Sequence, residues 1–237
     1  MRCGLVTICY NEERFIKPFL EHIPKWVDEV TVLVSTKPWN GEHKKQDDTA
    51  NIARGMGVNV VEKHWTSETD QRNTGQLLHQ DKDWVIILDP DEFLDDENWG
   101  NLKKYLEASK ADAAIVEGQR TYWKNGWMAD PPRDYPMLIA ARPSVKFVDK
   151  RVIGASYEVA PVWLDHLSWA RTNDEVWSKI SHYAHATDFN IEEWYKNVWL
   201  KWQPGDEDVH PVTPSTLHRF MKAELPPELE RLDLWPK

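Results

Sequence analysis

The first 110 residues alternate short apolar runs with helix-like spacing, and this alternation is the strongest constraint on the fold. Strands are predicted by apolar or β-branched runs at residues 5–9, 30–35, 58–62 and 83–88. Helices are predicted by apolar spacing at about residues 15–23, 50–56, 72–79 and 99–108. Strands and helices that alternate in this way form a mostly parallel α/β sheet, which binds ligands at the carboxyl ends of its strands.

The pattern changes after the first 110 residues. β-rich segments follow at residues 113–117, 120–123, 137–141 and 146–153, and helices at 174–180 and 191–202. A proline-punctuated tail begins at Pro204. We therefore expect three parts: an α/β half (residues 1–110), a β-rich half of the same domain (111–172) and a helical C-terminal extension (173–237).

Tryptophan is unusually frequent in the second half. The chain has 14 tryptophans, and six of them fall within forty residues: Trp163, Trp169, Trp177, Trp194, Trp199 and Trp202. Tryptophan is large and mostly buried, so we expect most of these rings to pack in a core or between helices. A minority could form a platform on which a sugar ring stacks.

The charge balance excludes some partners. The chain carries 29 basic and 39 acidic residues, for a net charge of −10, which disfavours binding of nucleic acid or anionic lipid across the whole surface. A local basic patch remains between Arg142 and Arg151, with Lys146 and Lys150. The longest apolar stretches are about five residues, far short of the ~20 that a membrane-spanning helix needs, so no integral membrane contact is expected.

The N-terminal ten residues predict a strand and not a signal peptide, because the apolar run is short and lacks a small-residue cleavage pattern. The two cysteines, Cys3 and Cys9, lie on this strand. They share a face about 20 Å apart and cannot pair. A reduced, cytoplasmic location is therefore expected.

An acidic cluster, Asp-Pro-Asp-Glu at residues 89–92, directly follows a buried strand. Carboxylates at a strand end are costly unless a cation or hydrogen bonds satisfy them. Mg²⁺ and Mn²⁺ bind one or two protein carboxylates and share their other positions with phosphates and water. The cluster therefore predicts a divalent-metal site, with a solvated turn as the alternative.

Three other segments should reach the same sheet edge. They are Tyr-Asn-Glu-Glu at residues 10–13, Asp-Asp-Thr at 47–49 and Arg-Asn-Thr-Gly at 72–75. In order and spacing, these segments and the acidic cluster resemble the family-2 glycosyltransferases, which have the GT-A fold. The resemblance covers about residues 1–110 and implies sugar transfer from a nucleoside diphosphate donor, with a UDP-sugar favoured.

By this resemblance Tyr10, Asn11 and Glu12 would face the nucleotide base, and Arg72 would lie near the base or the pyrophosphate. Asp89 would contact the ribose. Asp91 would coordinate the Mn²⁺ or Mg²⁺ that bridges the diphosphate. The chain departs from the family at residues 37–46, where a longer loop replaces a short serine-containing turn after an aspartate.

The second half resembles the family more loosely. Ser-Tyr-Glu at residues 156–158 stands where the family has a His-Glu pair, and residues 165–169 are similar to its His-x-Ser-aromatic segment. The resemblance makes Glu158 the general base and His166 a third metal ligand or a diphosphate contact. Asp149 and Asp165 are alternative bases, and Glu158 could instead pair with Arg151. His182 and His185 are the alternatives to His166.

The prediction is a metal-dependent, inverting glycosyltransferase with a GT-A fold and a helical, tryptophan-rich extension. Phosphate-binding, dinucleotide-binding and nucleophile-elbow motifs of other enzyme classes are absent from the sequence. A sugar nucleotidyltransferase and a non-catalytic carbohydrate-binding module are the alternatives. The acceptor is left open between a glycan, a small molecule and, through the local basic patch, a hydroxylated nucleic-acid base. The oligomeric state stays undetermined.

Overall fold

The computed structural model describes residues 1–124, 126–130, 137–213, 217–232 and 234–235. Parts of the predicted C-terminal tail, residues 214–216, 233 and 236–237, therefore lie outside the described residues. Among the residues that are described, no helix is both long enough and apolar enough to cross a membrane.

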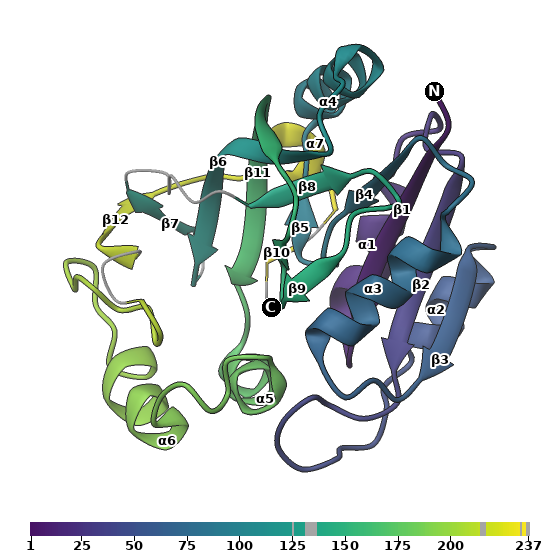
Figure 1. Cartoon of the computed structure of the whole chain (residues 1–237). Coiled ribbons are helices and arrows are strands. Elements are labelled where there is room, and N and C mark those ends of the chain that lie inside the picture. The colour runs from purple at the N-terminus through teal and green to yellow at the C-terminus, as the bar shows by residue number, and fades with distance from the viewer. Residues whose placement is uncertain (125, 131–136, 214–216, 233, 236–237) are drawn as a thin grey trace.

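The N-terminal half is a parallel sheet with helices on both faces (Figure 1). Its elements are β1 (Cys3–Cys9), α1 (Glu13–Glu21), β2 (Glu29–Ser35), α2 (Thr49–Gly55), β3 (Asn59–Lys63), α3 (Glu68–Leu78) and β4 (Trp84–Ile87). The strands lie in the order β3-β2-β1-β4, and all neighbours are parallel. The predicted strand–helix alternation is confirmed.

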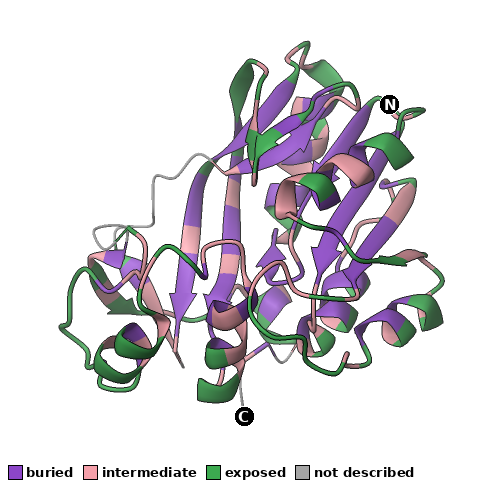
Figure 2. Ribbon diagram, turned by 60° about the horizontal axis from the view of Figure 1, so that its bottom comes forward, coloured by how far each residue is buried: buried purple, intermediate pink, exposed green. Residues whose placement is uncertain are grey.

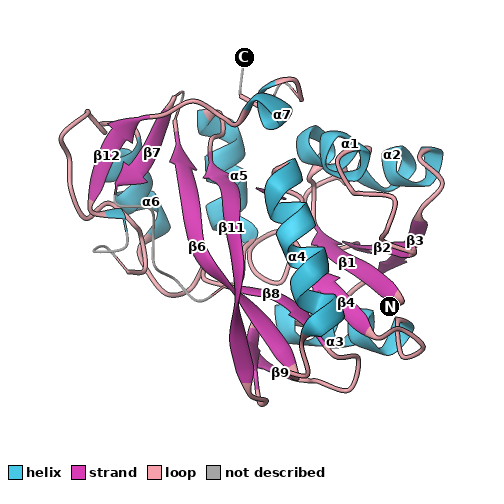
Figure 3. Cartoon of the chain, turned by 90° about the horizontal axis from the view of Figure 1, so that it is seen from above, coloured by secondary structure: helices cyan, strands magenta, loops and turns pink. Residues whose placement is uncertain are grey.

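The two faces of β1 meet different helices because its side chains alternate in direction (Figure 3). Leu5 packs in one buried cluster with Phe15 of α1 and Ala53 of α2. Val6 points to the opposite face, where it meets Gly75 of α3. Cys3 and Cys9 share the face of Leu5 and are free thiols, as the even spacing predicts.

Gly75 lies inside α3, where the helix touches β1. A Cβ atom at this position would lie 2.4 Å from Val6 Cγ1, so Gly75→Ala should lower the free energy of unfolding by about 1–3 kcal/mol, although alanine is the better helix former. Gly100 in helix α4 (Asp96–Ala108) is the matched control, because no atom lies within 4 Å of its Cβ position. Gly100→Ala should instead raise that free energy by about 0.5–1 kcal/mol. Equal changes in the free energy of unfolding of the two variants, measured by urea denaturation, would contradict this packing.

The second half extends the sheet with mixed strands. Its elements are β5 (Glu92–Phe93), α4 (Asp96–Ala108), β6 (Ala113–Trp123), β7 (Trp127–Asp130), β8 (Leu138–Ala141), β9 (Phe147–Asp149), β10 (Val152–Ile153) and β11 (Tyr157–Trp169). β8 is antiparallel to β4, and β6 is antiparallel to β8 and parallel to β11. β9 and β10 form a separate hairpin. β6 and β8 are largely buried, whereas β9, β10 and the start of β11 are mostly exposed or half-buried (Figure 2).

The C-terminal extension is only partly helical. It contains α5 (Asn173–His182), α6 (Ile191–Trp194), a π-helical segment (Tyr195–Trp199), β12 (Arg219–Lys222) and α7 (Pro227–Glu230). β12 returns to pair antiparallel with β7 at the sheet edge. A single α-helix was predicted at residues 191–202, but the structure has the short helix α6 followed by the π-helical segment. The strand β12, which comes later in the chain, was not predicted from the sequence.

Tryptophan packing attaches this extension to the sheet. The ring of Trp123 on β6 lies 5.5 Å from that of Trp169 and 4.9 Å from that of Trp199, centroid to centroid. Trp194 and Trp202 belong to the same buried cluster. Most of the concentrated tryptophans are thus core residues, as their size predicts, and Trp169 also lines the pocket described below.

Candidate active site

A pocket of about 820 Å³ opens at the carboxyl ends of the parallel strands. Its wall includes the turn after β1, the segment after β4, the β9–β10 hairpin and α5. This is the edge of the sheet at which α/β proteins bind ligands. The volume of the pocket lies within the range of about 300–1,000 Å³ that is typical of small-molecule sites. Seven of the eight predicted site residues line it: Tyr10, Asn11, Glu12, Arg72, Asp89, Asp91 and His166.

The turn after β1 fixes one wall of the pocket. Asn11 has a φ of 55°, a left-handed conformation that asparagine tolerates well, and its Oδ1 accepts a hydrogen bond from the Asp47 N–H at 3.1 Å. The Tyr10 hydroxyl accepts a hydrogen bond from the Lys44 N–H at 3.1 Å. Tyr10 and Asn11 therefore hold the end of the loop of residues 37–46.

Asp89 is held by an arginine from α3. Arg72 Nη2 donates to both carboxylate oxygens of Asp89, at 3.0 and 2.9 Å, and its Nε donates to Glu68 at 2.8 Å. Burial acts to raise the pKa of Asp89, but Arg72 and Arg151 outweigh it and hold the pKa below its ordinary value. Asp89 therefore stays ionised beside a fixed guanidinium at the pocket wall.

Asp91 is the most strongly compensated carboxylate of the site. Its Oδ2 accepts hydrogen bonds from Arg171 Nη2 at 2.7 Å and from Lys179 Nζ at 2.6 Å. Its Oδ1 lies 3.6 Å from His166 Nε2. Burial acts to raise the pKa of Asp91, but Lys179, His166 and Arg171 outweigh it and hold the pKa well below its ordinary value.

Arg171 links Asp91 to the turn after β1. Its Nη2 also donates to the two carboxylate oxygens of Glu12, at 3.2 and 2.9 Å. Burial raises the pKa of Glu12, with Arg171 acting in the opposite direction. Glu12 is thus held by Arg171 at the pocket wall. No motif in the sequence marks Arg171 as a site residue.

Arg151, part of the predicted basic patch, has a structural role and connects neighbouring segments of the fold. Its Nη1 donates to Glu92 Oε1 at 2.5 Å, and its Nη2 donates to the carbonyl oxygens of Ile87 and Leu138 at 2.7 and 2.8 Å. Glu92 in turn accepts a hydrogen bond from the backbone N–H of Asp89 at 2.9 Å. These bonds fix the acidic segment onto the ends of β4 and β8, so Arg151 does not pair with Glu158.

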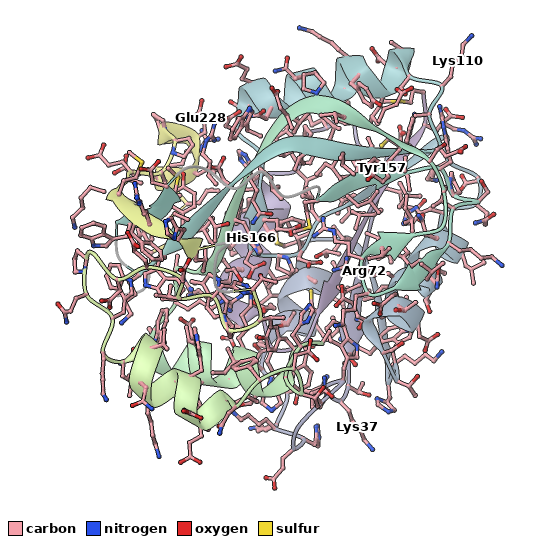
Figure 4. All side chains as sticks on the ribbon, turned by 60° about the vertical axis from the view of Figure 1, so that its left-hand side comes forward. Lys37, Arg72, Lys110, Tyr157, His166 and Glu228 are labelled. Carbon is pink, nitrogen blue, oxygen red and sulfur yellow. The ribbon has the colours of Figure 1, made fainter. Side chains whose placement is uncertain are left out.

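Glu158 lies outside the pocket, contrary to the expectation that it acts there as the base. Its exposed carboxylate accepts hydrogen bonds from Tyr105 at 3.1 Å and Ser109 at 3.4 Å. Eight residues of β11 separate Glu158 from His166, which corresponds to ~26 Å of extended strand. In Figure 4, Tyr157, the neighbour of Glu158, lies above both His166 and Arg72 and not beside His166.

The two alternative bases have different surroundings. Asp165 is buried and accepts hydrogen bonds from Arg120 at 2.9 Å and Tyr122 at 2.9 Å, and burial raises its pKa to about 6. Its side chain alternates with that of His166 along β11 and does not line the pocket. Asp149, at the end of β9, lines the pocket, and no described residue donates a hydrogen bond to its carboxylate.

The alternative histidines also line the pocket, and both have structural partners. His182 bridges the carbonyl oxygens of Ser178 at 2.6 Å and Glu42 at 3.0 Å. Burial lowers the pKa of His182, and its neutral ring can donate to only one of these two carbonyl oxygens. His185 Nδ1 lies 2.6 Å from an Asp188 oxygen. His166 is therefore the histidine that faces the acidic segment.

The donor atoms around Asp91 fit a divalent ion shared between protein and substrate. Asp91 Oδ1 and His166 Nε2 lie 3.6 Å apart on the pocket wall. A carboxylate oxygen suits Mg²⁺ or Mn²⁺, and imidazole is a common ligand of transition metals. Within the described parts of the chain, no three His, Cys, Asp or Glu side chains are grouped to hold a metal. Two protein ligands would leave the remaining positions for phosphates and water.

Comparison with known proteins identifies the class. A sequence model of glycosyl transferase family 2 matches residues 5–155, and the chain belongs to this family. The match includes the acidic segment and Arg72, whereas His166, Arg171 and Lys179 lie beyond it. The GT-A fold expected from the sequence is confirmed by the parallel sheet and the family.

The curated relatives are much longer than the matched region. An uncharacterized glycosyltransferase of Rickettsia typhi is 30% identical over 90 residues, which cover 38% of this chain and 28% of that protein. A TPR repeat-containing protein of Synechococcus elongatus is 25% identical over 118 residues, which cover 50% of this chain and 27% of that protein. The chain thus matches just over a quarter of the length of these relatives.

Two solved structures are similar to this chain at low sequence identity. Glucosyl-3-phosphoglycerate synthase from Mycobacterium tuberculosis, in complex with Mn²⁺, UDP and phosphoglyceric acid, has a TM-score of 0.49 and 16% identity, covering 74% of this chain and 73% of that one. S. aureus TarS 1-349 also has a TM-score of 0.49, with 13% identity, covering 75% of this chain and 63% of that one.

Proposed function

We propose that this protein transfers a sugar from a nucleoside diphosphate sugar to an acceptor hydroxyl, with the aid of a divalent metal and with inversion at the anomeric carbon. The observation that carries the proposal is the position of Asp89 and Asp91. Both side chains line a pocket of about 820 Å³, and the chain belongs to glycosyl transferase family 2. Uridine is the nucleoside that the family resemblance favours.

The cations of the pocket suit the leaving group. A nucleoside diphosphate gains negative charge as the bond to the sugar breaks, and fixed positive groups stabilise that charge. Arg171 and Lys179 form ion pairs with Asp91, and both line the pocket. Asp91 and His166 would hold the metal ion, which when bound would neutralise charge on the diphosphate oxygens.

We assign the role of general base to Asp149. Direct displacement at the anomeric carbon needs a group that accepts the proton of the acceptor hydroxyl, and a carboxylate suits this role. Asp149 lines the pocket, and its carboxylate accepts no hydrogen bond from any described residue. The exposed position of Glu158 beside Tyr105 argues against Glu158 as the base.

A thermal-shift screen tests donor binding. A nucleoside diphosphate sugar that binds only the folded state should stabilise it by about 2.7 kcal/mol at a concentration of one hundred times Kd, or roughly 5–10 °C in Tm for a chain of this length. UDP-, GDP- and dTDP-sugars are each added with Mn²⁺ and with EDTA. We expect one of them, the UDP-sugar first, to raise Tm in Mn²⁺ and much less in EDTA. No shift in any sample of folded protein would contradict the proposed function.

A further inference from the structure

Two cations share one oxygen of Asp91, the carboxylate that we assign to the metal. Arg171 Nη2 and Lys179 Nζ both donate to Oδ2, at 2.7 and 2.6 Å. The Asp91 side chain is only 5% exposed. A divalent ion on this carboxylate would therefore meet two positive charges that are already in place.

The two cations are anchored differently. Arg171 is only 5% exposed on its side chain and has a second acidic partner in Glu12. Lys179 is 18% exposed, and its Nζ donates to no other side chain among the described residues. Lysine also has a flexible four-carbon chain with a compact charge, unlike the planar guanidinium of arginine. Lys179 can therefore leave Asp91 more easily than Arg171 can.

The backbone beneath Lys179 is fixed, so only its side chain needs to move. α5 begins with a capping box in which Thr172 and Glu175 bond each other's backbone N–H. Glu175 also pairs with Arg14 at 2.6 Å. Val176 and Ile180 are buried in the tryptophan cluster. The helix thus presents Lys179 to the pocket at a constant distance.

We propose that Lys179 is a built-in counter-ion of Asp91 that competes with the metal and is transferred to the donor diphosphate when the metal binds. This inference rests on the proposed function. Without metal, Lys179 neutralises a buried carboxylate that would otherwise be costly. With metal and donor bound, the lysine is repelled from Asp91, and the diphosphate is the anion that it meets in the pocket.

The proposal predicts opposite effects on two ligands when the charge of Lys179 is removed. In Lys179→Met, Mn²⁺ alone should bind about tenfold more tightly, because a competing cation is gone. UDP at saturating Mn²⁺ should bind about tenfold more weakly, because the contact between Lys179 and the diphosphate is gone. A lysine that only supports the shape of the pocket would weaken both ligands when it is replaced.

The experiment measures Mn²⁺ binding without nucleotide by electron paramagnetic resonance of the free ion. It measures UDP binding at saturating Mn²⁺ by calorimetry. Lys82→Met is the matched control, because Lys82 is 10% exposed and pairs with Glu29 at 2.6 Å outside the pocket. It should change neither affinity. Lys179→Arg restores the charge and should return both affinities toward the wild type. Lys179→Gln replaces the methionine variant if that variant does not fold.

Unchanged or weaker Mn²⁺ binding in Lys179→Met would overturn the counter-ion role while leaving the proposed function intact, provided that the wild type binds a nucleoside diphosphate sugar. Unchanged UDP binding at saturating Mn²⁺ would overturn the transfer to the diphosphate. If the wild type binds neither Mn²⁺ nor UDP, the proposed function itself fails.

Discussion

Asp149→Asn should lower the rate of sugar transfer by about 10²–10⁴-fold, the usual contribution of a general base. Asparagine has nearly the same shape as aspartate but cannot accept the proton of the acceptor hydroxyl. The affinity for UDP in Mn²⁺ should stay within about twofold of the wild type, because we assign Asp149 to the acceptor and not to the donor. Release of UDP from the donor sugar measures the rate, and calorimetry measures the affinity.

Glu158→Gln is the control for this assignment. Glu158 is exposed and bonded to Tyr105 and Ser109, so its replacement should leave both the rate and the affinity near the wild-type values. Full activity of Asp149→Asn would contradict its role as the base. Loss of activity in Glu158→Gln would show that this segment reaches the acceptor in the working enzyme.

Asp91→Asn should abolish the part of donor affinity that depends on Mn²⁺. The amide keeps the shape of the side chain but loses the charge that holds a divalent ion, so we expect UDP binding in Mn²⁺ to weaken by about a hundredfold. Binding in EDTA should not weaken, because Arg171 and Lys179 would then no longer be held by a negative charge and could meet the diphosphate. Paired calorimetric titrations in Mn²⁺ and EDTA measure both values.

Stability must be measured alongside this variant. Removing one partner of a buried ion pair costs roughly 3–5 kcal/mol, so the titrations are run well below the Tm of Asp91→Asn. Asp96→Asn, in the first turn of α4 and exposed, is the matched control and should change neither stability nor binding appreciably. An Asp91→Asn protein that is folded and still binds UDP more tightly in Mn²⁺ than in EDTA would remove Asp91 from the metal site.

The parallel half of the fold was predictable because each strand is a continuous apolar run. Residues 84–88 of the β4 segment and 32–35 of β2 are buried on both faces of the sheet, and such strands need no alternation to be recognised. Asp89 and Asp91 follow one of these strands directly in the sequence, so local reasoning was sufficient to find them.

β11 was harder to predict because Pro161 lies inside it. Proline interrupts the hydrogen bonding of a central strand and argues against one in sequence analysis. In the structure the register with β6 shifts between Ala160 and Trp163, and this irregularity accommodates the proline. The misplacement of Glu158 follows from the same strand, whose extended length separates that residue from His166.

The cations of the site were missed for a different reason. Arg171 and Lys179 lie 80 and 88 residues after Asp91 in the sequence, and no local pattern marks either of them as its partner. They reach Asp91 because β11 runs back to the sheet edge beside β5 and α5 begins there. Such pairings depend on the path of the whole chain, and a single sequence does not reveal them.

A crystal structure with UDP and Mn²⁺ would test the central claim most directly. We predict that the diphosphate lies in the pocket, with the metal between it and the Asp91 and His166 side chains and with Lys179 turned from Asp91 to a phosphate oxygen. UDP bound elsewhere on the folded protein, or a diphosphate in the pocket without contact to the acidic segment, would contradict the account.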